Sequence, residues 1–178
     1  KIKAVGLCDS NNLCGALEFS ELIAKSKTQP IIGTQINIKY KEHVGKIPLF
    51  AKNLEGYKNL IRLSSKSFLE IKDNEDPHCT IQDLEENYKG LILLSGTFDG
   101  LIGKLFFKNL TDEIFILFKR FKKIFNDNFY LEIQRHNDVG EKLYENFLLK
   151  TSENLSIPII ATHEVFYLDK SMYEAHDA

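Results

Sequence analysis

Apolar runs of strand length alternate with longer amphipathic segments along most of this chain, and this alternation limits the folds open to it. The apolar runs predict strands at residues 4–8, 30–40, 47–51, 91–95, 129–134 and 158–162. The amphipathic segments predict helices at residues 13–27, 54–68, 101–107, 111–125 and 139–155, with further helix starts at 80 and 171. Thr80 and Asp83 have the spacing of a capping box, and Thr111 is the expected N-cap of the helix that ends at 125. Strands and helices that alternate on this scale favour parallel βαβ units, so we expect an α/β fold with a doubly wound sheet or a closed barrel.

The size and charge of the chain indicate one ordinary globular domain. Its 178 residues are 43% hydrophobic and carry a formal net charge of -2, so the chain can bury one core and has no strongly basic tail for nucleic acid. We expect a single domain over residues 1–178, with the polar stretch 73–78 as an exposed loop. No apolar run approaches the roughly 20 residues that cross a bilayer, so no membrane association is expected.

The three cysteines, Cys8, Cys14 and Cys79, indicate where the protein works. They are odd in number and lack the paired spacing of a zinc site. Since disulfides belong mainly to oxidising compartments, this pattern favours a reduced, cytoplasmic setting.

The first expected strand ends in a polar turn, Asp9-Ser10-Asn11-Asn12, before the first helix begins. In α/β folds the carboxyl ends of strands carry the chemistry, because the loops there gather side chains from several strands. A zinc or manganese cluster at this turn would be expected to place a histidine beside Asp9, and the sequence has Ser10 there instead.

Six segments in order resemble the PHP (polymerase and histidinol phosphatase) domain of the alpha subunit of bacterial DNA polymerase III. They are residues 8–15, 27–33, 51–53 with 56–60, 90–96, 129–136 and 157–162, followed by Glu174-Ala175-His176-Asp177-Ala178. The resemblance implies a distorted (βα)7 barrel of the TIM type with, in active members, a metal cluster at the carboxyl ends of the strands. It also implies that a first strand with a His-x-His motif precedes Lys1, so that this chain lacks the opening strand of the barrel.

The resemblance further implies that the metal cluster is vestigial. Ser10 stands where active members have histidine, Gln35 where they have glutamate, Thr97 where they have cysteine and Phe166 where they have histidine, while Asp9 and Glu164 keep carboxylates. Hydroxyl, amide and phenyl groups do not supply the anionic and imidazole ligands that hold such ions. We therefore expect no cofactor in this chain and no catalytic residue.

A smaller set of polar residues leaves a metal-binding alternative open. Strand alternation places Glu132, Gln134 and His136 on one face of their strand. Together with Asp9, His163 and Glu164 they could hold a single Zn or Mn ion. The more ordinary interpretation is that these polar groups satisfy one another by hydrogen bonds inside the barrel.

By resemblance, the function is that of a domain within a replicative DNA-directed DNA polymerase, a nucleotidyltransferase that uses Mg and reaches DNA through the rest of the parent chain. A degenerate domain of this kind would brace the polymerase core and bind the proofreading exonuclease subunit, beside other replicase subunits. Two alternatives remain: an active metal-dependent phosphoesterase, acting as a 3′-5′ exonuclease or pyrophosphatase, and a stand-alone PHP phosphatase.

The strongest basic run, residues 119–123, has a phenylalanine at its centre and could contact a DNA backbone. The preferred interpretation is a solvated helix face above a phenylalanine stripe that packs inward. His43 and the pair His78-Cys79 lie in stretches that resemble loops, and we expect them to be solvated rather than to bind a ligand.

Overall fold

The computed structural model describes residues 2–72, 74–136, 138–165, 167 and 169–173. Its strands are β1 (Ala4–Ser10), β2 (Gln29–Tyr40), β3 (His43–Ala51), β4 (Cys79–Thr80), β5 (Leu91–Leu94), β6 (Phe129–Ile133) and β7 (Ile159–Ala161). Its α-helices are α1 (Ala16–Lys25), α2 (Leu54–Leu69), α3 (Ile81–Glu86), α4 (Leu101–Phe107), α5 (Thr111–Phe125) and α6 (Glu141–Leu155), and two short 3-10 turns span Asn126–Asn128 and Lys170–Met172. None of the helices in the described part of the chain is long and apolar enough to cross a membrane.

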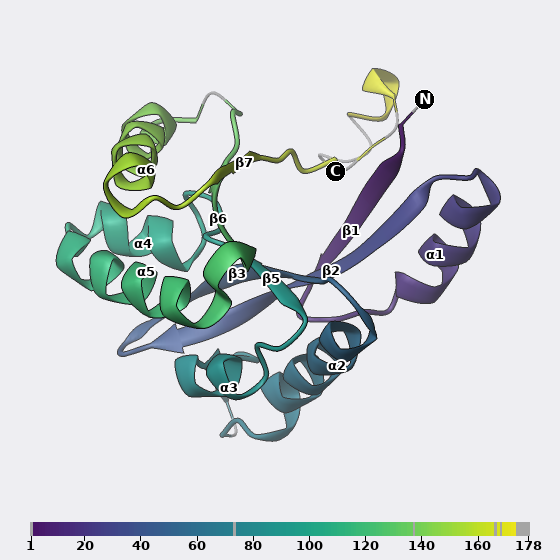
Figure 1. Ribbon diagram of the computed structural model, residues 1–178, viewed down its shortest axis with the longest axis horizontal. Helices are drawn as coiled ribbons and strands as arrows, with labels where there is room; N and C mark the ends of the chain where they lie inside the picture. The colour runs from purple at the N-terminus through teal and green to yellow at the C-terminus, as the bar shows by residue number, and fades with distance from the viewer. Residues whose placement is uncertain (1, 73, 137, 166, 168, 174–178) are drawn as a thin grey trace.

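The strands form one curled sheet in the order β1-β2-β3-β5-β6-β7, and the short β4 pairs with β2 outside this path. The helices lie around the outside of the curve (Figure 1). This arrangement is a mixed α/β, partly closed barrel, so the expected barrel-type α/β class is confirmed.

The expectation that the strands are all parallel is wrong for β3, which runs antiparallel to both β2 and β5. Only Lys41 and Glu42 join β2 to β3, and Lys41 adopts a left-handed φ of 54°. A two-residue connection closes a hairpin, whereas a parallel crossover needs about a dozen residues. The hairpin also extends the strand to His43, four residues before its expected start.

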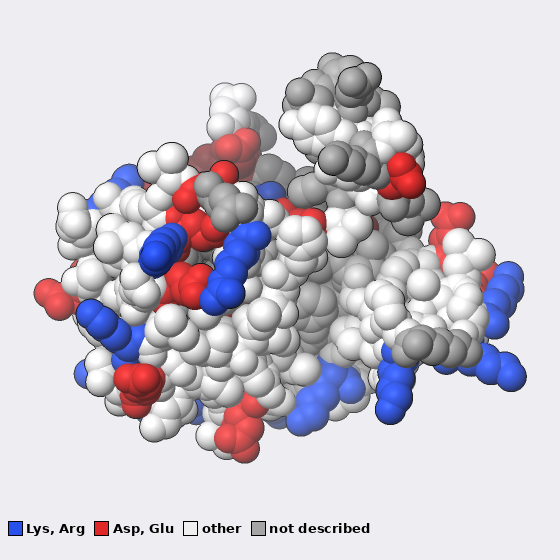
Figure 2. Space-filling model, turned by 90° about the horizontal axis from the view of Figure 1, so that it is seen from above, with Lys and Arg blue, Asp and Glu red and all other residues white. Residues whose placement is uncertain are grey.

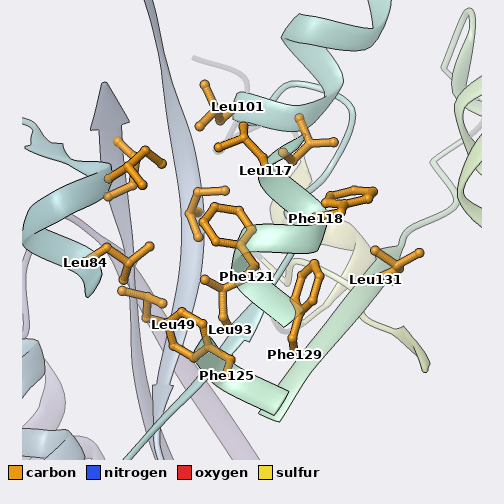
Figure 3. Packing of buried hydrophobic residues seen from close by; sticks show 14 of the residues in the cluster. Leu49, Leu84, Leu93, Leu101, Leu117, Phe118, Phe121, Phe125, Phe129 and Leu131 are labelled. Atoms are coloured by element: carbon orange, nitrogen blue, oxygen red, sulfur yellow. The ribbon is translucent and has the colours of Figure 1, made fainter. Parts of the chain in front are cut away.

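The hydrophobic core lies between the sheet and the helices, with phenylalanines of α5 at its centre. Phe118, Phe121 and Phe125 point from α5 toward Leu93 and Phe129 of the sheet (Figure 3). The rings of Phe118 and Phe121 lie 5.6 and 5.7 Å from that of Phe129. Because fully burying a phenylalanine contributes about 1.5–3 kcal/mol, this stripe holds α5 on the sheet.

Local capping explains where several helices begin. Thr80 and Asp83 form the expected capping box at α3, since the Thr80 side chain accepts from the Asp83 amide and the Asp83 side chain accepts from the Thr80 amide. Thr111, expected as the cap of α5, is instead the first helical residue. The cap is Leu110, whose amide bonds Leu105 O at 3.0 Å as the chain leaves α4.

The segment Gly56-Tyr57-Lys58-Asn59-Leu60, one of those that carried the resemblance, packs against the turn before β5. A β carbon at Gly56 would lie 1.9 Å from the carbonyl oxygen of Gly90, so no larger side chain fits without movement. The buried Asn59 side chain donates to Lys89 O at 2.8 Å. These contacts give the segment a structural role, because they fix the start of α2 beside the start of β5.

Two residues expected in solvated loops are buried. His43 is 7% exposed at the start of β3, and Cys79 is 1% exposed in β4, where its thiol contacts Leu63 O. The sequence reading missed β4 because two residues are too short to show a period.

Candidate functional site

A buried carboxylate on β6, that of Glu132, lies at the centre of the polar interior. The residue is 4% exposed, and its backbone amide donates to Ser95 Oγ at 2.9 Å. The Thr162 hydroxyl donates to Glu132 Oε1, while Oε2 is buried without a hydrogen bond of normal geometry from the described residues. Burial raises the pKa of Glu132, the negative charge of Glu164 raises it further, and the bond from Thr162 lowers it. On balance the pKa of this carboxyl lies above its ordinary value, so Glu132 takes up a proton more readily than a solvated carboxyl does.

A directional chain of hydrogen bonds leads from the surface to this carboxylate. His136 Nε2 lies 3.0 Å from Gln134 Oε1, and Gln134 Nε2 donates to Thr162 Oγ1 at 2.9 Å. The Thr162 hydroxyl in turn donates to Glu132 Oε1. In this chain the His136 Nε2 carries the proton, so that nitrogen has no lone pair left for a metal ion. Of the three residues expected on one strand face, only Glu132 lies in β6, which ends at Ile133, while Gln134 and His136 follow the strand and join Glu132 through these hydrogen bonds.

A second bridge links β2 to the segment after β7. Gln35 Nε2 donates to Glu164 Oε1 at 2.9 Å, over 129 positions of sequence. His163, beside it in sequence, stacks its ring on that of His136 with centroids 4.9 Å apart. The structure therefore brings Gln35, Glu164, His136 and His163 to the same end of the sheet as Glu132.

On β1 the residue that faces these carboxylates is Cys8. Burial raises the pKa of the Cys8 thiol, followed by the charges of Glu132, Asp9 and Glu164. Asp9 itself points to the helix side, since its Oδ2 lies 3.3 Å from the position that a β carbon on Gly15 would take. The strand alternation of the sequence separates Cys8 from Asp9, but it does not tell which of the two faces the interior.

Of the other positions expected to be vestigial, Thr97 lies near Glu132 and Ser10 lies at the surface. Thr97, in the loop after β5, lines a small cavity beside Glu132, and its hydroxyl bonds Asp99. Ser10 is exposed at the end of β1, and its carbonyl accepts from Asn12 Nδ2 at 3.0 Å. Phe166 lies outside the described residues.

The small cavity beside Glu132 has a volume of about 10 Å³ and is closed on another side by Tyr144 of α6. Burial raises the pKa of the Tyr144 hydroxyl, and the charge of Glu132 adds to this. The hydroxyl lies near Ser95 but makes no hydrogen bond of normal geometry in the described chain. The cavity has room for about one water molecule, which could bridge Glu132 Oε2 and the Tyr144 hydroxyl.

The donor set does not fit the metal cluster that the fold class implies. Within the described ranges, no group of three or more His, Cys, Asp or Glu side chains is arranged to hold a metal ion. Gln35 and Thr97 offer a neutral amide and a hydroxyl, and the His136 Nε2 is committed as a donor.

The basic run 119–123 is mostly engaged in structural contacts. Arg120 pairs with Glu85, Lys122 bonds the carbonyl of Leu155, and Phe121 is buried. Basic and acidic side chains alternate over the face seen in Figure 2 rather than forming a field of one sign. The interpretation as a solvated helix face fits these contacts.

Comparison with known proteins agrees with this geometry. The model of the PHP domain family matches residues 1–136. DNA polymerase III subunit alpha of Rickettsia bellii is 40% identical over 99% of this chain, that of Caulobacter vibrioides 35% over 100%, and that of Vibrio cholerae 33% over 98%. This chain spans only 15–16% of the length of these relatives.

A solved structure described as a metal-dependent phosphoesterase from Bifidobacterium adolescentis shares the fold. Its TM-score is 0.56 at 10% sequence identity, and the match covers 89% of this chain and 76% of that one. The matched family model, the shared fold and the curled, partly closed barrel agree, and the chain belongs to the PHP domain family.

Proposed function

We propose that this chain is the PHP part of a DNA polymerase III alpha subunit, within a longer protein that carries out DNA-directed DNA synthesis. The support is the identity of 33–40% to alpha subunits over at least 98% of this chain. The polymerase reaction and its Mg²⁺ then belong to residues outside these 178. The proposed location is the cytoplasm, in agreement with the unpaired cysteines in the described chain.

The metal site of this PHP domain is degenerate in our proposal, and hydrogen bonds replace the ions. The observation that carries it is the chain from His136 through Gln134 and Thr162 to Glu132, because each donor is matched to an acceptor without a cation. The bridge between Gln35 and Glu164 does the same on the other side. A metal ion would have to break these bonds and compete with protons for the buried Glu132 carboxyl, whose pKa is raised.

In this role the domain is a scaffold that braces the polymerase and binds the proofreading exonuclease subunit. A packed core with a rigid polar interior suits such a role, since no moving part is needed for chemistry. Surface plasmon resonance tests the binding, with the full-length alpha subunit and a variant that lacks residues 1–178 passed over immobilised exonuclease subunit. We expect binding to be lost in the variant and its polymerase activity on primed DNA to be reduced but measurable, and equal binding by both would contradict the docking role.

An active phosphoesterase is the competing function. It is favoured by the fold shared with the protein described as a metal-dependent phosphoesterase and by the nearness of Glu132, Glu164 and Cys8. The substitution Glu132→Gln in the full-length protein separates the two. If the domain hydrolyses phosphate esters, 3′-5′ exonuclease or pyrophosphatase activity falls by orders of magnitude. If the site is degenerate, neither wild type nor variant shows metal-dependent hydrolysis above background.

A further inference from the structure

An open groove lies outside the polar interior, between the β2–β3 turn and α4. Its volume is about 590 Å³, and it shares only Phe98 with the lining of the small cavity beside Glu132. A volume in this range suits a small-molecule ligand. The turn and the helix are held in close contact, because a β carbon on Gly45 would lie 2.5 Å from Leu101 Cα. The walls of the groove are therefore preformed.

Two ammonium groups line the same wall. Lys104 lies on α4 and Lys108, four residues later, is the C-cap of this helix, so their side chains share a helix face. Lys104 Nζ donates to Val44 O at 2.9 Å, and Lys108 Nζ lies 3.2 Å from His43 Nδ1. Each ammonium has three protons and uses one in these contacts. The remaining protons can bind an anion.

The buried imidazole of His43 adds a third donor. Because His43 Nδ1 accepts from Lys108, its proton lies on Nε2. Nε2 is buried, and although Glu42 Oε1 lies 3.2 Å away, no described residue makes a hydrogen bond of normal geometry to it. His43 lines the groove, and its buried Nε2 donor is costly unless an acceptor reaches it.

The rest of the lining is apolar or acidic. The Phe107 ring is 45% exposed, and Phe98 and Val44 lie beside it. An exposed phenyl face next to ammonium groups suits an aromatic ring, since offset stacking buries both faces. The carboxylates of Glu42 and Asp99 can accept from hydroxyl or amino groups.

We propose that this groove binds a small phosphate monoester that carries an aromatic ring, with a nucleoside monophosphate as its representative. Lys104, Lys108 and His43 bind the phosphate, Phe107 stacks on the ring, and Asp99 and Glu42 accept from the hydroxyls between them. Two lysines and a histidine favour an anion over a cation, and the two carboxylates favour a ligand with donor groups over inorganic phosphate alone. The proposal does not depend on the function proposed above.

Photoaffinity labelling of the full-length protein with 8-azidoadenosine monophosphate tests the proposal, followed by peptide mapping by mass spectrometry. Mapping is needed because a longer polymerase chain can bind nucleotides elsewhere. We expect label on peptides that contain residues 98–108, with competition by adenosine monophosphate at lower concentration than by inorganic phosphate or adenosine.

A double variant and a matched control decide the result. Lys104→Gln with Lys108→Gln should reduce labelling of these peptides at least about tenfold, because charge-assisted hydrogen bonds are lost. Lys119→Gln with Lys123→Gln makes the same charge change on exposed positions of α5 and should leave labelling unchanged. Phe107→Ala keeps the lysines and should remove the advantage of adenosine monophosphate over inorganic phosphate. Label only outside residues 42–44 and 98–108, or equal loss in both double variants, would overturn the proposal.

Discussion

The side chain of Gln35 donates a hydrogen bond of 2.9 Å to the carboxylate of Glu164, and so joins β2 to the chain that follows β7. By resemblance, both residues stand at positions that would bind metal in active PHP domains. An amide and a carboxylate satisfy each other directly, whereas two carboxylates at this distance need a cation or a proton between them.

Replacing Gln35 by Glu should therefore destabilise the protein at neutral pH. We expect a loss of about 1–2 kcal/mol, because two carboxylates would face each other near the buried Glu132. The loss should shrink below pH 4, where carboxylates take up protons. Thermal unfolding between pH 3 and pH 8 measures the loss.

Gln82→Glu is the matched control, since Gln82 makes the same 2.9 Å bond to Glu86 on an exposed helix. A like-charge pair there should cost about 0.5 kcal/mol or less. Equal losses of stability in the two variants would show that the bridge from Gln35 to Glu164 is no more sensitive to a second carboxylate than an exposed helical pair.

The carboxyl of Glu132 should make stability depend on pH in the opposite sense to most acidic residues. Its pKa is raised by burial, so the native state holds the proton more tightly than the unfolded state does. This contribution to stability is complete below the unfolded pKa and is lost as pH rises through the folded pKa. Glu132→Gln should remove this loss of stability at high pH, because the amide does not ionise. The variant should be more stable than the wild type by about 1 kcal/mol at pH 8, with little change at pH 4.

Glu113→Gln provides the contrast in the same pH series. The Lys41 ammonium, with a hydrogen bond from Tyr40, lowers the pKa of Glu113. Its contribution is present above the unfolded pKa and is lost as pH falls through the folded pKa, so this variant should lose stability mainly at neutral pH. Parallel pH profiles for the two variants would contradict the assigned environments.

Gly56→Ala should destabilise the domain by about 2–3 kcal/mol, because the new β carbon meets the Gly90 carbonyl and the backbone must move. Gly6→Ala is the control, since its β carbon would meet its nearest neighbour at 3.6 Å. Chemical denaturation of both variants gives the comparison. A neutral Gly56→Ala would show that α2 and the turn before β5 are not tightly coupled.

Phe118→Ala should cost about 3–5 kcal/mol, because the ring is fully buried between α5 and Phe129. Phe68→Ala removes a ring that is 53% exposed on α2 and should change the free energy of unfolding by about 0.5 kcal/mol or less. Urea titration measures both. Similar losses of stability in the two variants would show that Phe118 is not part of the hydrophobic core.

The periodicity of the sequence predicted the positions of the long helices well, and α5 begins and ends where its apolar stripe does. Strand direction was the main error, because periodicity carries no direction. The short gap after Tyr40 was nevertheless a usable signal, since it leaves no room for a crossover to a parallel β3.

For the site, strand alternation correctly grouped Glu132 with Gln134 and His136. It could not show that Cys8 rather than Asp9 faces them, since this depends on which face of β1 the helices cover. Nor could it find Thr162, whose hydroxyl connects two strands only after the sheet has curled. The prediction that no metal binds stays a prediction.

The metal content of the purified full-length protein tests the central claim most directly. Protein prepared with zinc and manganese in the medium and freed of loosely bound ions should contain well under one equivalent of either metal per chain. Glu132→Gln should leave that content unchanged. One or more tightly bound equivalents that are lost in Glu132→Gln would contradict a site closed by hydrogen bonds.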